Sequence, residues 1–195
     1  MRQFIVVSHT AKITPDFSLN DLPGDGGRMD ILCRCVGASL LTSHAIRPNV
    51  RIYLLLQDQI TIRIESSKTR YLHPDERCIA ALIKKALEKA ADAVGQIEIK
   101  STPGIYISKR NLRSLLTSID PGATFIYLNE DGFPSQKFTF PSEPVFILSD
   151  HHNFSSSELD ILKEYAQTAI NLGPVSLHAD QAITIVHNLL DVQNA

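Results

Sequence analysis

Short apolar runs bounded by turn residues alternate along this chain with segments of helical periodicity. Runs of four to eight apolar residues are typical of buried strands, and apolar residues recurring every three or four positions are typical of amphipathic helices. The pattern predicts strands at residues 4–7, 50–56, 60–65, 105–108, 124–128, 145–148 and 169–172. It predicts helices at residues 28–43, 73–94, 155–167 and 178–192, with a short helix after Lys109. This alternation over 195 residues predicts a single α/β domain with a mostly parallel sheet.

The periodicity also assigns faces to three of the predicted helices. In the helix at 28–43, it places Arg28, Asp30 and Arg34 on the outer side, with Asp30 and Arg34 spaced for an i,i+4 ion pair. In the helix at 73–94, the apolar stripe extends to Val94. The closing helix carries an apolar face at Ala179, Ala182, Ile183, Val186, Leu189 and Leu190. Packing against the sheet of the same chain would be sufficient to bury this face.

Three predicted strands end in polar or turn residues. These ends are Leu128-Asn129, Ser149-Asp150 and Leu172-Gly173-Pro174. In parallel sheets, ligands bind in the crevice at the carboxyl ends of the strands, so a small-molecule site is expected here. The chain has no G-x-x-x-x-G-K-[ST] motif, which excludes a P-loop, and no G-x-G-x-x-G after a strand, so a Rossmann dinucleotide site lacks its fingerprint.

Charge is distributed unevenly along the chain. Residues 1–113 carry 17 Lys or Arg and 11 Asp or Glu, whereas residues 114–195 carry two and ten, which together give the net charge of −2. A basic part beside an acidic part indicates that residues 1–113 bind a polyanionic partner. The alternative interpretation is that the basic residues are scattered over the solvated faces of helices. Three cysteines are few and odd in number, which favours a reducing cytoplasm, and no apolar run is long enough to span a membrane.

The tripeptide Asp150-His151-His152 is a candidate for metal chemistry. By itself it resembles the metal-dependent DHH phosphoesterases, so such an enzyme is one alternative for this chain. That family also needs aspartate motifs near its first strands, and no Asp-x-Asp is present there. Nucleophilic catalysis by Cys33, Cys35 or Cys78 is disfavoured, because the cysteines fall on helix faces that belong to the predicted core.

Several longer motifs occur in order along nearly the whole chain. They are Asp21-Leu22-Pro23-Gly24, Gly27-Arg28-Met29-Asp30, Ser43-His44-x-Ile46-Arg47, Pro74-Asp75-Glu76-Arg77, Ser101-Thr102-Pro103-Gly104-Ile105-Tyr106, Pro144-Val145-Phe146 with Asp150-His151, and Leu177-His178-Ala179 with His187-Asn188. On these motifs the chain resembles the archaeal tRNA pseudouridine N1-methyltransferases of the SPOUT superfamily. The resemblance implies a C-terminal trefoil knot, a homodimer, S-adenosyl-L-methionine as cofactor and tRNA as partner. It implies methylation of N1 of the pseudouridine at position 54, in the TΨC loop.

The same resemblance implies roles for particular residues. Residues 124–192 would be the cofactor-binding knot, and the basic residues 1–113 would face the RNA. The implied cofactor-binding residues are Leu128, Ser149, Asp150, Leu172, Gly173, Leu177 and Ala182. The phosphate-binding candidates are Arg28, Arg34, Arg47, Arg77 and Arg110, and the candidates for proton removal or base orientation are Asp30, Asp75 and Asp150, with no metal.

Two residues depart from the family pattern. Ser149 stands where relatives usually have Gly, and Ala182 stands where they usually have Cys, although a small residue is kept at both places. An RNA-binding SPOUT relative that no longer methylates is therefore a further alternative.

Overall fold

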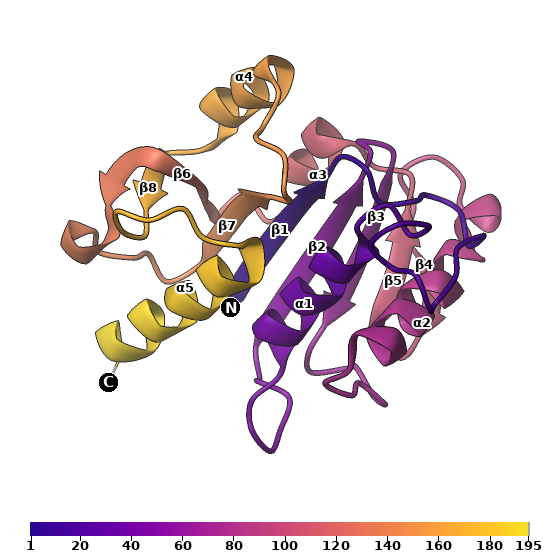
Figure 1. Cartoon of the computed structure of the whole chain (residues 1–195). Helices are drawn as coiled ribbons and strands as arrows, with labels where there is room; N and C mark the ends of the chain where they lie inside the picture. Colours follow the sequence, from indigo (N-terminus) through magenta and orange to yellow (C-terminus); the bar gives the residue numbers. More distant parts are fainter. Residues whose placement is uncertain (195) are drawn as a thin grey trace.

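A computed structural model describes residues 1–194. Within them, eight strands form one sheet in the order β4-β5-β3-β2-β1-β7-β6-β8, and five α-helices cover its two faces (Figure 1). The strands are β1 (Arg2–Ser8), β2 (Val50–Leu56), β3 (Ile60–Glu65), β4 (Ile99–Thr102), β5 (Ile105–Ser108), β6 (Thr124–Pro134), β7 (Pro144–Ser149) and β8 (Thr168–Asn171). The helices are α1 (Met29–Leu40), α2 (Glu76–Leu87), α3 (Leu112–Ser118), α4 (Ser156–Tyr165) and α5 (Ala179–Gln193). None of these described helices is both long and apolar enough to cross a membrane.

The centre of the sheet is parallel and buried on both faces. Strands β2, β1, β7, β6 and β8 run in the same direction, and β3, β5 and β4 extend the sheet by antiparallel pairing. In β1, Phe4 and Val6 pack with α1, α2 and α5 on one face, while Ile5 and Val7 pack with α3 and α4 on the other. Burial on both sides explains the continuous apolar runs of the sequence. The predicted α/β domain with a mostly parallel sheet is confirmed.

Helix α5 is fixed to α1 and β1 by a buried histidine. Nδ1 of His187 lies 3.2 Å from Nη1 of Arg2, and its Nε2 lies 3.0 Å from the carbonyl oxygen of Ser39. Burial lowers the pKa of His187 to about 4, so the neutral ring accepts from Arg2 and donates to Ser39. The apolar face of α5, including Ile183, Val186 and Leu190, is covered by the core of its own chain.

Several predicted boundaries and faces are wrong. The helix predicted at 73–94 stops at Leu87, and Val94 is 74 % exposed because a 3-10 turn and Gly95, at φ 54°, turn the chain toward β4. The helix predicted at 28–43 ends at Leu40, since Leu41 is extended and pairs with Ile46. Asp30, which was placed on the outer side, is buried because Arg28 and Arg34 enclose its carboxylate. Strand β4 was not predicted.

Strand β6 continues beyond its predicted end. It pairs with β8 at Leu128 and again at Phe133, both opposite Ile170, with a register shift between them. Gly132 makes this possible, because a Cβ at that position would lie 2.6–2.7 Å from the backbone of Ile170. The residues between Leu128 and Phe133 therefore form an irregular excursion within β6, and Gly132 lies next to the end of β8.

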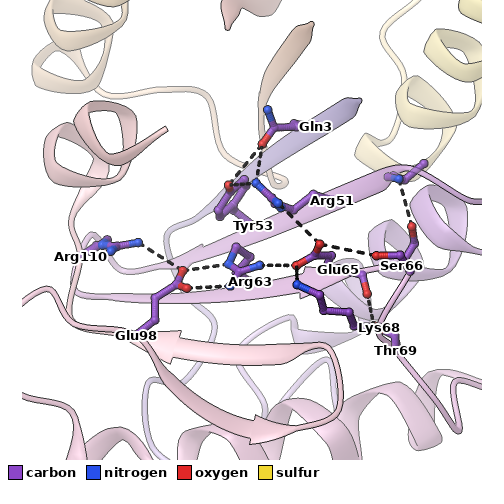
Figure 2. Close-up of polar contacts among 12 residues, drawn as sticks. Gln3, Arg51, Tyr53, Arg63, Glu65, Ser66, Lys68, Thr69, Glu98 and Arg110 are labelled. Atoms are coloured by element: carbon purple, nitrogen blue, oxygen red, sulfur yellow. Dashed lines mark hydrogen bonds and ion pairs between the residues drawn. The ribbon is translucent and has the colours of Figure 1, made fainter. Parts of the chain in front are cut away.

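A polar network crosses β1, β2 and β3 on the face that packs α3 and α4 (Figure 2). Arg63 is at its centre: Nε and Nη2 donate to Glu98 at 2.9 and 2.7 Å, and Nη1 donates to Glu65 at 2.9 Å. The guanidinium also lies 4.1 Å from the ring centroid of Tyr106. Arg110 binds Glu98 from the other side at 3.2 Å. These arginines are held by carboxylates of their own chain.

Candidate functional site

A cavity of about 660 Å³ opens at the carboxyl ends of β6, β7 and β8. The N-terminal halves of α1 and α5 close its sides, through Ile31 and Arg34 from α1 and Ala179 and Ala182 from α5. This volume is within the range of pockets for small molecules. A smaller cavity of about 340 Å³ lies at the opposite end of β1 and β7, beside Arg2 and Pro144, and shares none of these strand ends.

All the residues that the resemblance assigned to cofactor binding line the larger cavity. Parallel pairing brings them together, because Leu128 lies opposite Ile170 in β8 and β6 is also paired with β7. The chain then leaves β8 through Leu172 and Gly173 and returns along the cavity to the start of α5. The lining residues in question are Leu128, Ser149, Asp150, Leu172, Gly173, Leu177 and Ala182.

Ser149 and Ala182, the two residues that depart from the family pattern, both line the cavity and leave it open. Ser149 closes the loop at residues 149–153, because its hydroxyl donates to the carbonyl of His152. Ala182 is 8 % exposed, and its methyl group is smaller than the cysteine side chain that relatives usually have at this position. Neither residue fills the cavity.

The carboxylate of Asp150 is turned into the protein, with its side chain 1 % exposed. Oδ2 accepts from the hydroxyl of Ser8 at 3.0 Å and from the backbone of His9 at 2.9 Å. Oδ1 accepts from the backbone of His152 at 2.9 Å and faces Nδ1 of His9 at 3.0 Å. Burial alone would raise the pKa of Asp150, but the hydrogen bonds from His152 and His9 outweigh it and hold the pKa below its usual value. Asp150 therefore organises the loop as an ionised acceptor.

Sequence reasoning missed His9. It directly follows β1, and β1 pairs with β7 so that Val7 lies opposite Ser149, which places His9 beside Asp150. The other ring nitrogen, Nε2, lies 3.1 Å from Oε2 of Glu158 in α4. Only the neighbour relation of β1 and β7 brings these residues together, and the residue pattern did not reveal that relation.

Arg28 and Arg34 border the cavity and enclose Asp30. Arg28 donates to Asp30 at 3.1 and 3.2 Å, and Arg34 lies 3.2 Å from it. Burial would raise the pKa of Asp30, but the hydrogen bonds from Arg28 and the charge of Arg34 hold it below its usual value. Arg28 has φ 68° and ψ 31°, a left-handed conformation that is strained for a residue with a side chain and recurs at functional sites.

The remaining predicted residues lie elsewhere. Asp75 caps α2 by accepting from the backbones of Arg77 and Cys78, and it does not line the cavity. Arg47 pairs with Asp191 and lines the smaller cavity, and Arg110 belongs to the network of Figure 2. Arg77 is exposed at the start of α2. The five arginines therefore do not form one patch, and only Arg28 and Arg34 lie at the site.

One carboxylate oxygen beside the cavity accepts no hydrogen bond from the residues that the structure describes. Oδ1 of Asp180, in the first turn of α5, is buried without a hydrogen-bond partner among the described residues, and Nε of Arg34 approaches it only to 3.7 Å. Within residues 1–194, no three His, Cys, Asp or Glu side chains gather as metal ligands. Asp150 points toward His9 rather than to a shared centre with His151 and His152, so the phosphoesterase alternative finds no support.

The whole chain, residues 1–195, matches the protein family described as "Putative SAM-dependent RNA methyltransferase". The chain belongs to this family.

Members of the family that are similar to the chain share its full length. The tRNA (pseudouridine(54)-N(1))-methyltransferase of Haloarcula marismortui is 47 % identical over 191 residues, which are 98 % of this chain and 96 % of that protein. The enzymes of the same name from Haloferax volcanii and Methanococcoides burtonii are 48 % and 45 % identical, with the same shares covered. The family resemblance inferred from the motifs is confirmed.

A solved structure supports the fold. Nep1 of Archaeoglobus fulgidus, bound to S-adenosylhomocysteine, superposes with a TM-score of 0.70 and covers 99 % of this chain and 98 % of that chain. Its sequence is 15 % identical, so the likeness concerns the fold.

Proposed function

We propose that this protein is a tRNA methyltransferase that transfers a methyl group from S-adenosylmethionine to N1 of the pseudouridine at position 54 of tRNA. The observation that carries the proposal is that all the expected cofactor residues line one cavity, at the ends of β6, β7 and β8, in a chain of this family. Relatives named for this reaction cover 98 % of the chain at 45–48 % identity. The structural neighbour Nep1 holds S-adenosylhomocysteine, the product that such a transfer leaves behind.

The residues of the cavity fit this cofactor. S-adenosylmethionine supplies an activated methyl group on a positively charged sulfur. Leu128, Leu172, Leu177 and Ala182 give the cavity apolar walls, and the loops after β7 and β8 bring backbone groups to the strand ends. The side chain of Asp180, which lines the cavity and is 24 % exposed, offers a carboxylate to a positively charged group of the ligand.

The protein's main catalytic task is alignment. N1 of pseudouridine would form a bond to the methyl carbon while the bond from that carbon to the cofactor's sulfur breaks, which leaves S-adenosylhomocysteine; the proton of N1 would leave to water. Holding both partners in reacting geometry contributes up to about 7–11 kcal/mol in favourable cases. Asp30 and Asp150 are surrounded by donors that hold the pKa of each below its usual value, so we assign them positioning roles. Asp75, as the cap of α2, has no contact with the cavity.

Arg28 and Arg34 are placed to bind the tRNA backbone beside the target base. Both line the cavity and are about one third exposed, at 38 % and 35 % of their side chains. Arg28 keeps a strained backbone there, which supports a functional position. Arg47, Arg77 and Arg110 would contact RNA only if it extended well beyond the cavity.

We further propose that residues 124–192 form the trefoil knot of the SPOUT superfamily, that the protein is a homodimer, and that it acts in the cytoplasm. The first proposal rests on the family resemblance of the sequence motifs. The second and third rest on the family resemblance and on the low cysteine content.

Titration calorimetry with S-adenosylmethionine tests the cofactor part of this proposal. Dissociation constants from low micromolar to submillimolar are expected, which correspond to about −5 to −8 kcal/mol. Absence of both heat and a thermal shift at saturating cofactor would contradict the proposal.

A further inference from the structure

His9 lies between two carboxylates from different parts of the chain. Its Nδ1 is 3.0 Å from Oδ1 of Asp150, and its Nε2 is 3.1 Å from Oε2 of Glu158. Glu158 is fixed in turn by Ser155, whose backbone N–H and hydroxyl donate to Oε2 at 2.7 and 2.8 Å. The imidazole therefore joins the end of β1, the loop at residues 149–153 and the first turn of α4.

The geometry determines the protonation state of the ring. An ionised carboxylate can only accept hydrogen bonds, so a nitrogen facing one must carry a proton. Burial would raise the pKa of both Asp150 and Glu158, but hydrogen bonds outweigh it and lower the pKa of each. Burial would lower the pKa of His9, but the hydrogen bonds to Glu158 and Asp150 raise it above 6.5. Both ring nitrogens of His9 therefore donate to a carboxylate in the protonated form that this arrangement favours.

His9 acts on the cavity through the loop. Asp150, which His9 binds, also accepts from the backbone of His152, and Ser149 closes the same loop onto the carbonyl of His152. Ser149, Asp150, His151 and His152 line the cavity, whereas His9 is not among the described residues that line it. His9 would thus influence substrate or cofactor only through the loop.

We propose that His9, with a proton on each ring nitrogen, is a positioning residue that holds the cofactor loop at residues 149–153 against α4 and keeps the cavity formed for S-adenosylmethionine. The proposal rests on the proposed function. Without this bridge, the loop must be ordered when the cofactor binds, and that ordering reduces affinity. Loss of a hydrogen bond to a charged group corresponds to about tenfold in an equilibrium constant.

A pH dependence follows from the same contacts. The groups that face His9 are Asp150, His151 and His152 from the loop and Glu158 from α4. Because the pKa of His9 is raised in the folded protein, its proton stabilises the closed loop fully below about pH 6.5 and is lost as the pH rises through the raised pKa. Cofactor affinity should fall over that window.

Calorimetry of S-adenosylmethionine binding between about pH 6 and 9.5 tests the proposal. The wild type is compared with His9→Gln, with Glu158→Gln and with His44→Gln, a control in the exposed loop after α1. At pH 6.5, His9→Gln should bind about tenfold more weakly than the wild type and should lose the pH dependence that His9 supplies. Glu158→Gln should move the midpoint of the pH profile downward, because one of the two carboxylates that raise the pKa is neutral. His44→Gln should follow the wild type.

Nitrogen-15 spectra of the cofactor-free protein supply a second readout. A pH titration followed in these spectra should place the pKa of His9 above 6.5 in the wild type, and this result tests the proposal if His9→Gln does not fold. Equal affinities and pH profiles for the wild type and His9→Gln, or a pKa of His9 at or below 6.5, would overturn the proposal. Failure of the wild type to bind the cofactor would instead overturn the proposed function.

Discussion

Ala182 is the residue whose size sets the width of the cavity beside α5. Its methyl group is 8 % exposed and lines the cavity, so a longer side chain must enter the space assigned to the cofactor. Ala182→Leu should weaken S-adenosylmethionine binding by at least about tenfold, or 1.4 kcal/mol, in calorimetry. Ala81→Leu, on the exposed side of α2, is the matched control and should leave affinity unchanged. Wild-type affinity in a folded Ala182→Leu protein would exclude Ala182 from the cofactor site.

Arg28 gives a second prediction at the residue scale, for RNA binding. Alanine has the same left-handed backbone strain as arginine, so Arg28→Ala removes the guanidinium without relaxing the loop. Binding to tRNA should weaken, and the slope of log affinity against log salt should fall by about one. Arg113→Ala, far from the cavity on α3, is the control for loss of one positive charge. Equal salt slopes for the two variants would contradict a phosphate contact at Arg28.

Sequence reasoning located residues that line the larger cavity but not the histidine that orients their loop. Leu128, Ser149 and Leu172 follow apolar runs, so strand ends could be located from the pattern and the family motifs. His9 was not found, because its role depends on β1 lying beside β7, and 141 residues separate it from Asp150. Asp30 was placed outside because helical periodicity does not account for two arginines that neutralise a buried carboxylate.

Among the elements, buried strands were predictable and short polar ones were not. The runs that became β2, β3 and β5 were located to the residue, because apolar and β-branched side chains dominate them. Strand β4 carries Lys100, Ser101 and Thr102 after a single isoleucine, so no apolar run marks it. It exists because β5 pairs with it at the sheet edge, which is a tertiary effect.

The network around Arg63 gives a prediction at the scale of the sheet. The side chains of Arg63 and Glu98 are 13 % and 23 % exposed, and removal of the guanidinium leaves Glu98 and Glu65 without their main partner. Arg63→Met should lower the free energy of unfolding by about 2–4 kcal/mol in urea denaturation. Lys163→Met breaks the exposed pair with Asp160 and should change it by less than about 1 kcal/mol. Similar losses in both variants would show that the network does not stabilise the sheet.

At the scale of the whole molecule, the order of the strands was beyond the sequence pattern. Apolar runs indicate that strands exist, but the neighbours of β1, namely β2 and β7, come from distant parts of the chain. The structure also changes how the uneven distribution of charge along the chain is interpreted. Most arginines of the basic part, including Arg2, Arg47, Arg63 and Arg110, pair with carboxylates, so the net charge of a segment does not locate a binding face.

Assembly is a prediction for the whole molecule. The apolar face of α5 is covered by its own chain, so a second copy must use other surface, and the exposed apolar side chains of the C-terminal part are Phe133, Val175 and Val192. Light scattering at micromolar concentration should give twice the mass of one chain. A monomeric mass that persists as the concentration is raised would refute the homodimer.

The reaction itself is tested most directly with paired tRNA transcripts that differ at one base. One carries uridine and the other pseudouridine at position 54, and both are incubated with cofactor labelled in the methyl group. In uridine, N1 is bonded to the sugar and cannot accept a methyl group, whereas in pseudouridine it is free. The account predicts label in the pseudouridine transcript alone. Label in both transcripts, or in neither while the protein still binds the cofactor, would contradict it.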